Sequence, residues 1–92
     1  MSSELSVHHD LTTHQFQIDL NGQRAYLVYM DLGKRTLDFY RTFVPEAMRG
    51  KGIAAMLVKA ALEYAREEGY TVIPSCSYVE RYLHTNPNEN AQ

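Results

Sequence analysis

The sequence is poor in cysteine, in proline and in charge of one sign, and each scarcity excludes a class of protein. Its 92 residues include one cysteine and three prolines, and the formal net charge is −2. A single thiol cannot form an internal disulfide, which excludes a small disulfide-stapled extracellular domain. The nine Lys and Arg residues are spread along the chain, so no basic patch would attract nucleic acid.

Long apolar runs and a recognisable targeting segment are also missing. No apolar run approaches the roughly 20 residues that a membrane-spanning helix needs. The first ten residues, MSSELSVHHD, lack the basic and apolar segments of a secretory signal. We therefore expect a cytoplasmic protein without a membrane or nucleic-acid partner. The four histidines show no metal-ligand spacing, which predicts no metal site.

The composition present is that of an ordinary globular domain, with 45% hydrophobic and 22% charged residues. The length allows one hydrophobic core, so we expect a single domain over residues 1–92, as a monomer or weak dimer. Residues 84–92 are polar and are expected to form a frayed tail.

Residues 13–20, THQFQIDL, alternate apolar and polar side chains, which is typical of a strand with one buried face. The Asn21-Gly22 pair favours a type I′ turn, because both residues tolerate positive φ. Residues 23–30 are then expected to pair back as the second strand of an N-terminal hairpin.

A polar turn is expected at residues 31–35, followed by a third strand over residues 36–44 that Pro45 ends. By alternation, one face of this strand would carry Leu37 and Phe39, with Arg41 and Phe43 as candidates for the same face.

An amphipathic helix is predicted over residues 52–68, ended by Gly69. Its apolar stripe consists of Ile53, Met56, Leu57, Ala60 and Tyr64. Residues 70–74 would form a short strand parallel to the third strand, because a helix connects the two. Ser77–His84 is expected to form a last helix. The fold class is therefore α/β: a mixed, mostly antiparallel sheet with an N-terminal hairpin, a central βαβ unit and a short C-terminal helix.

The segment Arg49, Gly50, Lys51 and Gly52 stands where the third strand passes into the helix. Glycine disfavours a helix, so two of them here indicate a sharp bend or a close backbone approach. Unpaired N–H groups and the helix dipole favour an anion, and the two cations strengthen that preference. The spacing matches neither a Walker A loop nor the dinucleotide fingerprint, which argues against ATP and NAD. The alternative is that the glycines only form a turn.

The pattern Arg49-x-x-Gly52-x-Ala54 resembles the acyl-CoA motif [RQ]-x-x-G-x-[GA] of the GNAT superfamily of N-acetyltransferases. Residues 42–83 look like the central part of its short, single-domain subgroup, and the hairpin agrees. The resemblance implies that coenzyme A, as acetyl-CoA, is bound, with its pyrophosphate on the backbone of Arg49, Gly50, Lys51, Gly52, Ile53 and Ala54. It further implies that Phe43 and Val44 receive the pantetheine arm. Arg41-Thr42 stands where the subgroup often has His-Thr, so no imidazole base is available there.

Cys76 is expected to open the last helix, where the dipole lowers the pKa of a thiol. The resemblance places it at the cysteine considered catalytic in the subgroup. Three roles stay open: a nucleophile, a general acid toward the departing thiolate, or an inert buried thiol. If the amine attacks directly instead, Glu46 and Glu80 are the candidate bases, and Tyr78 and Tyr82 are candidate donors to the leaving thiolate.

The preferred interpretation is an acetyl-CoA-dependent N-acetyltransferase that modifies an unidentified amine, carried by a protein or a small molecule. The short chain leaves little material to enclose the acceptor, so an open acceptor side is expected. The alternative is a CoA-binding regulatory or interaction module without turnover.

Overall fold

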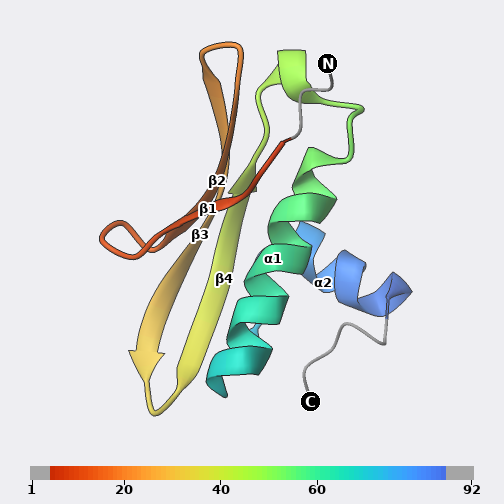
Figure 1. Ribbon diagram of the computed structural model, residues 1–92. Helices are drawn as coiled ribbons and strands as arrows, with labels where there is room; N and C mark the ends of the chain where they lie inside the picture. The colour runs from red at the N-terminus through yellow and green to blue at the C-terminus, as the bar shows by residue number, and fades with distance from the viewer. Residues whose placement is uncertain (1–4, 87–92) are drawn as a thin grey trace.

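The alternating segments form one mixed five-stranded sheet with the strand order β1-β2-β3-β4-β5 (Figure 1). The computed structural model describes residues 5–86. Its elements are β1 (His8–Asp10), β2 (Gln15–Leu20), β3 (Gln23–Gly33), β4 (Thr36–Phe43), the 3-10 helix η1 (Glu46–Met48), α1 (Ile53–Glu68), β5 (Thr71–Ile73) and α2 (Ser77–Thr85). Neighbouring strands are antiparallel except β4 and β5, which are parallel and joined through α1. The predicted fold class is confirmed, including the β2–β3 hairpin and the βαβ unit.

Helix α1 covers one face of the sheet, and the core lies between the two (Figure 1). Its buried side chains are Ile53, Leu57, Val58, Ala61, Leu62 and Ala65. The predicted stripe is incomplete: Met56, Ala60 and Tyr64 are half-buried and pack against the core, but the fully buried Val58, Ala61, Leu62 and Ala65 were not predicted. Helix α1 contacts four strands and α2, so apolar neighbours surround more of it than the sequence pattern indicates.

A β-bulge in β4 changes which of its side chains face the core. Between the pairs Tyr29–Phe39 and Val28–Arg41, Tyr40 is an extra residue on β4. Side chains alternate along a strand, so one extra residue reverses the alternation beyond it.

Beyond this bulge, the expectation that Arg41 and Phe43 face the core is wrong. Both side chains are exposed. The Phe43 ring packs against Tyr26 on the opposite face, with ring centroids 5.4 Å apart. Thr42 and Val44 are half-buried, and the reversed alternation turns them toward α1.

The turn between β3 and β4 is tighter than predicted. Strand β3 continues to Gly33, and the turn residues Lys34 and Arg35 have φ angles of 53° and 57°. The Arg35 guanidinium donates a hydrogen bond to the backbone carbonyl of Glu68 and lies 4.9 Å from the centre of the Tyr70 ring. The hairpin is thereby held against the end of α1, a contact between distant segments that local turn chemistry does not predict.

Helix α2 runs to Thr85, one residue beyond the predicted end at His84, so the predicted tail begins too early. The backbone N–H and the side-chain amide of Asn86 both donate to the Tyr82 carbonyl, at 2.9 and 3.0 Å. These bonds satisfy a carbonyl that a helix end leaves open. Residues 87–92 of the predicted tail lie outside the described residues.

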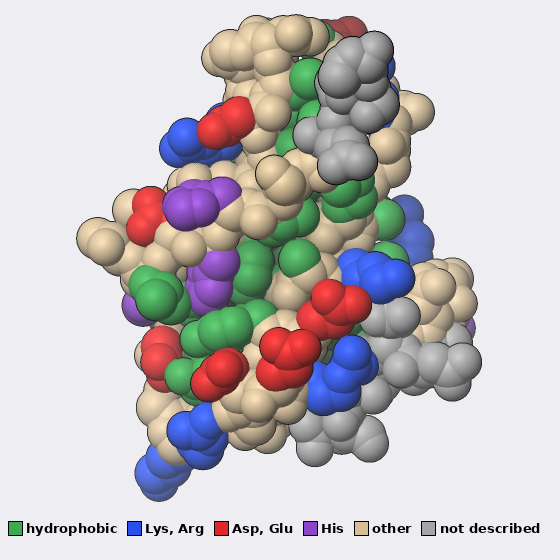
Figure 2. Space-filling view, viewed as in Figure 1, with side chains coloured by type: hydrophobic (Ala, Val, Ile, Leu, Met, Phe, Trp, Pro, Cys, Tyr) green, Lys and Arg blue, Asp and Glu red, His purple; other side chains and the backbone are tan. Residues whose placement is uncertain are grey.

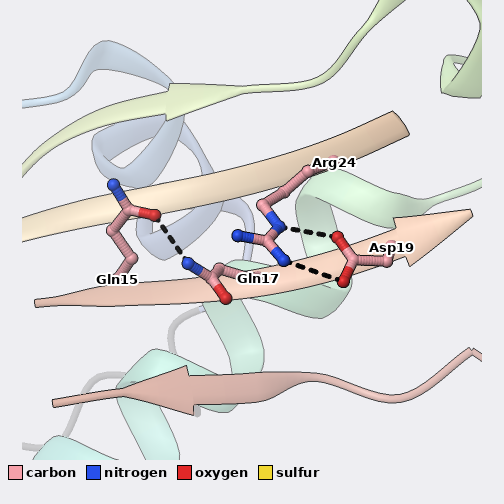
Figure 3. A network of polar contacts seen from close by, with 4 residues as sticks. All are labelled: Gln15, Gln17, Asp19 and Arg24. Atoms are coloured by element: carbon pink, nitrogen blue, oxygen red, sulfur yellow. Dashed lines mark hydrogen bonds and ion pairs between the residues drawn. The ribbon is translucent and has the colours of Figure 1, made fainter. Parts of the chain in front are cut away.

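The face of the sheet opposite α1 carries polar pairs (Figure 3). Gln17 donates to Gln15 along β2 at 2.8 Å, and Arg24 of β3 forms a two-point ion pair with Asp19 of β2 at 2.7 and 3.1 Å. The Arg24 and Asp19 side chains are 53% and 61% exposed, so this pair adds little stability.

The exposed side of α1 carries charges of both signs, including Lys59, Arg66 and Glu67. Figure 2 shows acidic and basic side chains next to one another on this view of the molecule. Such mixing gives good solvation without a strong field of one sign. Within residues 5–86, neither helix is long and apolar enough to cross a membrane.

Strand β1, which alternation did not predict, is held to the sheet by aromatic packing. The His9 ring stacks on Phe16 with centroids 4.0 Å apart and meets the edge of Tyr64 at 4.4 Å. Its Nε2 shares a 2.7 Å hydrogen bond with the Tyr29 hydroxyl. Burial lowers the pKa of His9, and the neighbouring His14 lowers it further.

Replacing His9 by Gln should reduce the loss of stability on going from about pH 7 to about pH 5. Because the pKa of His9 is lowered in the folded protein, the unfolded chain binds the proton more readily. This contribution to stability is therefore fully present above the unfolded value of 6.5, and it is lost as the pH falls from there through the lowered pKa of the folded protein. Urea unfolding of the wild type and of His9→Gln at the two pH values measures this contribution. An equal pH dependence of the free energy of unfolding in the two proteins would contradict the role assigned to His9.

Candidate functional site

The connection between β4 and α1 is a short, hydrogen-bonded loop. Met48 is buried at its centre, and its N–H donates to the Pro45 carbonyl at 2.9 Å. Arg49 Nε donates to the Val44 carbonyl at 3.0 Å, which ties the guanidinium to the end of β4. The first half of the loop, residues 44–49, is thus held to the end of β4.

Gly50 and Gly52 supply the backbone conformations that this loop requires. Their φ angles are 80° and 73°, in the left-handed region where a Cβ is unfavourable. A Cβ built at either position meets nothing within 4 Å, so the space beside the backbone is open. The glycines therefore turn the chain and also leave room for a ligand.

The first turn of α1 has backbone donors that the helix does not use. The first intrahelical bond runs from the Met56 N–H to the Gly52 carbonyl at 3.1 Å. The preceding N–H groups, those of Ile53, Ala54 and Ala55, therefore have no helical acceptor. Among the described residues no side chain caps this end, and the first turn carries no acidic residue. These donors and the helix dipole together favour an anion.

A cavity of about 210 Å³ lies against this helix start. Its lining residues are Val44, Met48, Arg49, Gly50, Gly52, Ile53, Ala54, Ala55 and Tyr78. Most of the predicted cofactor residues are thus brought together, but Phe43 and Lys51 do not line the cavity. Phe43 is turned to the other face of the sheet by the bulge, and Lys51 is exposed.

Met48 and Ala55 are cavity residues that sequence reasoning missed. Ala55 directly follows the glycine motif, so its place in the first helical turn was a usable signal. Met48 belongs to the unpredicted helix η1, and no sequence pattern indicated its position. Tyr78, considered only as a proton donor, also forms part of the wall.

Cys76 is half-buried and is the N-cap residue of α2, as expected. Its backbone N–H donates to the Phe39 carbonyl of β4 at 2.9 Å, and its Sγ lies 3.6 Å from the Thr42 hydroxyl. Burial by itself raises the pKa of this thiol. Hydrogen bonds from the Val79 N–H and from Thr42 outweigh it and leave the pKa lowered.

Cys76 itself does not line the cavity, and neither do three of the other candidates. Glu46 and Glu80 are exposed, and neither lines the cavity. Tyr82 is half-buried on α2 and is likewise not a cavity residue. Within the part of the chain that the structure describes, no group of three or more His, Cys, Asp or Glu side chains could hold a metal ion.

These features define a small mixed α/β protein with a candidate anion-binding loop between β4 and α1. The sequence model of the family described as GCN5-related N-acetyl-transferase matches residues 15–92. The chain therefore belongs to the GCN5-related N-acetyltransferase family, and the resemblance noted from the glycine motif is confirmed.

Individual relatives agree with this assignment. Protein NATD1 of Xenopus tropicalis is 43% identical over 88 residues, which cover 94% of this chain and 81% of the relative. Protein NATD1 of Homo sapiens is 44% identical over 85 residues, with 90% and 75% covered. The solution structure of a GCN5-like protein from Staphylococcus aureus matches with a TM-score of 0.73 at 27% identity, over 96% of this chain and 86% of that one.

Replacing Gly52 by Ala should lower the free energy of unfolding by about 1 kcal/mol, because an L-residue is strained at positive φ. No neighbour lies within 4 Å of the added Cβ, so the cost is conformational rather than steric. Gly52→Asn is the matched control, since asparagine adopts this conformation more readily. Chemical denaturation measures both, and an alanine variant as stable as wild type would contradict the argument.

Proposed function

We propose that the protein binds acetyl-CoA at the start of α1 and transfers the acetyl group to an amine. The observation that carries the proposal is the cavity that joins the uncapped first turn of α1 to the end of β4. Family membership supports acetyl transfer in general. The geometry of the cavity supports the start of α1 as the binding site.

The residues present fit the phosphates of coenzyme A. The N–H groups of Ile53, Ala54 and Ala55 are available as donors, and Gly50 and Gly52 present no Cβ to a ligand that approaches the backbone. Arg49 would add positive charge at the cavity wall. When bound, acetyl-CoA would supply an activated acyl group as a thioester.

Cys76 is the residue that we propose to take part in the transfer. The lowered pKa increases the fraction of thiolate at neutral pH, which favours the nucleophilic role over the inert one. In this role the Cys76 thiolate would form a bond to the acyl carbon while the bond from that carbon to the coenzyme A sulfur breaks, and the amine nitrogen would then take the acyl group and release the Cys76 thiolate. An ammonium acceptor first loses one proton to solvent, and the proton that the attacking amine loses ends on the departing coenzyme A thiolate.

The proposed acceptor is an exposed amine of a protein or a small molecule. Thr42 and Cys76 are both only half-buried, so the chain does not enclose the sulfur completely. We propose that the acceptor approaches this sulfur from solvent.

Calorimetric titration with acetyl-CoA should show binding by the wild type and a large loss in Gly52→Asp. The carboxylate would stand at the uncapped helix start and repel an anion. Micromolar affinity corresponds to about 8 kcal/mol, so the loss is readily measured. Arg49→Ala should weaken binding less, because it removes one charge and keeps the backbone donors.

Gly22→Asp is the matched control for this titration. Gly22 also has a positive φ, 80°, with nothing within 4 Å of an added Cβ, but it lies in the β2–β3 turn. This variant should bind like wild type. Equal loss in both aspartate variants, or no binding by the wild type, would contradict the proposed site.

Cys76→Ala separates an enzyme from a binding module. If Cys76 takes part in the transfer, the alanine variant should bind acetyl-CoA but release coenzyme A in the presence of amines at least about 100-fold more slowly. Free thiol release and calorimetry on the same preparations measure both properties. A wild type that holds acetyl-CoA unchanged would favour the alternative, a CoA-binding regulatory or interaction module.

A further inference from the structure

Thr42 is a hydroxyl residue on the core side of β4, where the preceding residues are apolar. It pairs with Leu27, which is fully buried, whereas uninterrupted alternation from Phe39 would turn it to the opposite face. The extra residue Tyr40 is what brings it to the side of α1. A bulge that turns a polar side chain inward calls for a partner of that side chain.

That partner is the sulfur of Cys76, 34 residues further along the chain. Thr42 Oγ1 and Cys76 Sγ are 3.6 Å apart, and both residues are half-buried. The Cys76 backbone is bound to β4 independently, through its N–H and the Phe39 carbonyl at 2.9 Å. Two contacts on either side of the bulge therefore fix the position of the thiol.

The hydroxyl can serve the sulfur in both protonation states. It accepts a hydrogen bond from the neutral thiol and, by rotation, donates one to the thiolate. The second bond is charge-assisted and stronger than the first, so the hydroxyl favours the thiolate. The N–H groups of Tyr78 and Val79 at the start of α2 act in the same direction.

We propose that Thr42 is the positioning residue of Cys76, which it orients and holds as a reactive thiolate beside the cavity. The proposal rests on the proposed function for its purpose, and on the bulge and the sulfur contact for its geometry. Val44 and Tyr78 line the cavity, and each is two residues away from one member of the pair. Neither Thr42 nor Cys76 is itself a lining residue, so the pair would act next to the cavity wall rather than inside the cavity.

The reactivity of the thiol can be followed without any substrate, because Cys76 is the single cysteine of the chain. The alkylation rate with iodoacetamide would be measured from pH 5 to pH 10 for the wild type, Thr42→Val and Thr42→Ser. Valine keeps the shape and removes the hydroxyl, whereas serine keeps the hydroxyl. In the valine variant the midpoint of the alkylation rate against pH should lie at higher pH, and the alkylation rate at pH 7 should be about fivefold lower. The profile of the serine variant should stay near that of the wild type.

Thr36→Val is the matched control, since it removes a hydroxyl from the same strand, where Thr36 bonds the Lys34 carbonyl instead. It should leave the alkylation profile unchanged. Equal midpoints for the wild type and Thr42→Val, or an equal shift in Thr36→Val, would overturn the proposal. A thermal unfolding curve for each variant confirms that the comparison is made on folded protein.

Acetyl-CoA binding and turnover then separate this proposal from the proposed function. Thr42→Val should bind acetyl-CoA with wild-type affinity, but its turnover rate should fall by the same factor as its fraction of Cys76 thiolate. Thr42→Ser should restore both the turnover rate and the thiolate fraction. If the wild type fails to turn over but the midpoint rises in Thr42→Val, the positioning role stands and the proposed function fails. If the wild type turns over and the midpoint does not move, the positioning role fails alone.

Discussion

The extra residue in β4 is the constraint on which the candidate site depends. Without Tyr40, alternation would turn Arg41 and Phe43 toward α1, and Thr42 and Val44 away from it. The bulge thus replaces a long cation and an aromatic ring with two small side chains beside the cavity. One of the two lines the cavity and the other meets the candidate cysteine. Bulges are often found where a strand has to redirect a side chain at a functional site.

The same position marks the end of the parallel pairing between β4 and β5. Register pairs run only from Thr36–Thr71 to Asp38–Ile73, and the next backbone contact is the bond from the Cys76 N–H to the Phe39 carbonyl. The chain leaves β5 at this point and enters α2 beside β4. The start of α2 and the loop that precedes α1 consequently lie near the same segment of β4.

Much of the fold followed from local patterns, since period-2 and helical spacing are properties of single elements. The Asn21-Gly22 turn, with φ angles of 53° and 80°, and the end of α1 at Gly69 illustrate this. The predictions failed where contacts between distant segments of the chain determine the local structure. Strand β1 depends on the aromatic neighbours of His9, and the tight turn at Lys34 depends on the contact of Arg35 with the end of α1.

The sequence by itself determined the glycine loop, the helix that follows it and the cysteine at the start of the last helix, because each depends on residues close together in the chain. Only the tertiary structure decided which side chains of β4 join them. The position of the bulge depends on the register between β3 and β4, which is set by cross-strand packing rather than by either strand alone. The partnership of Thr42 with Cys76 spans that packing, and no local pattern could have indicated it.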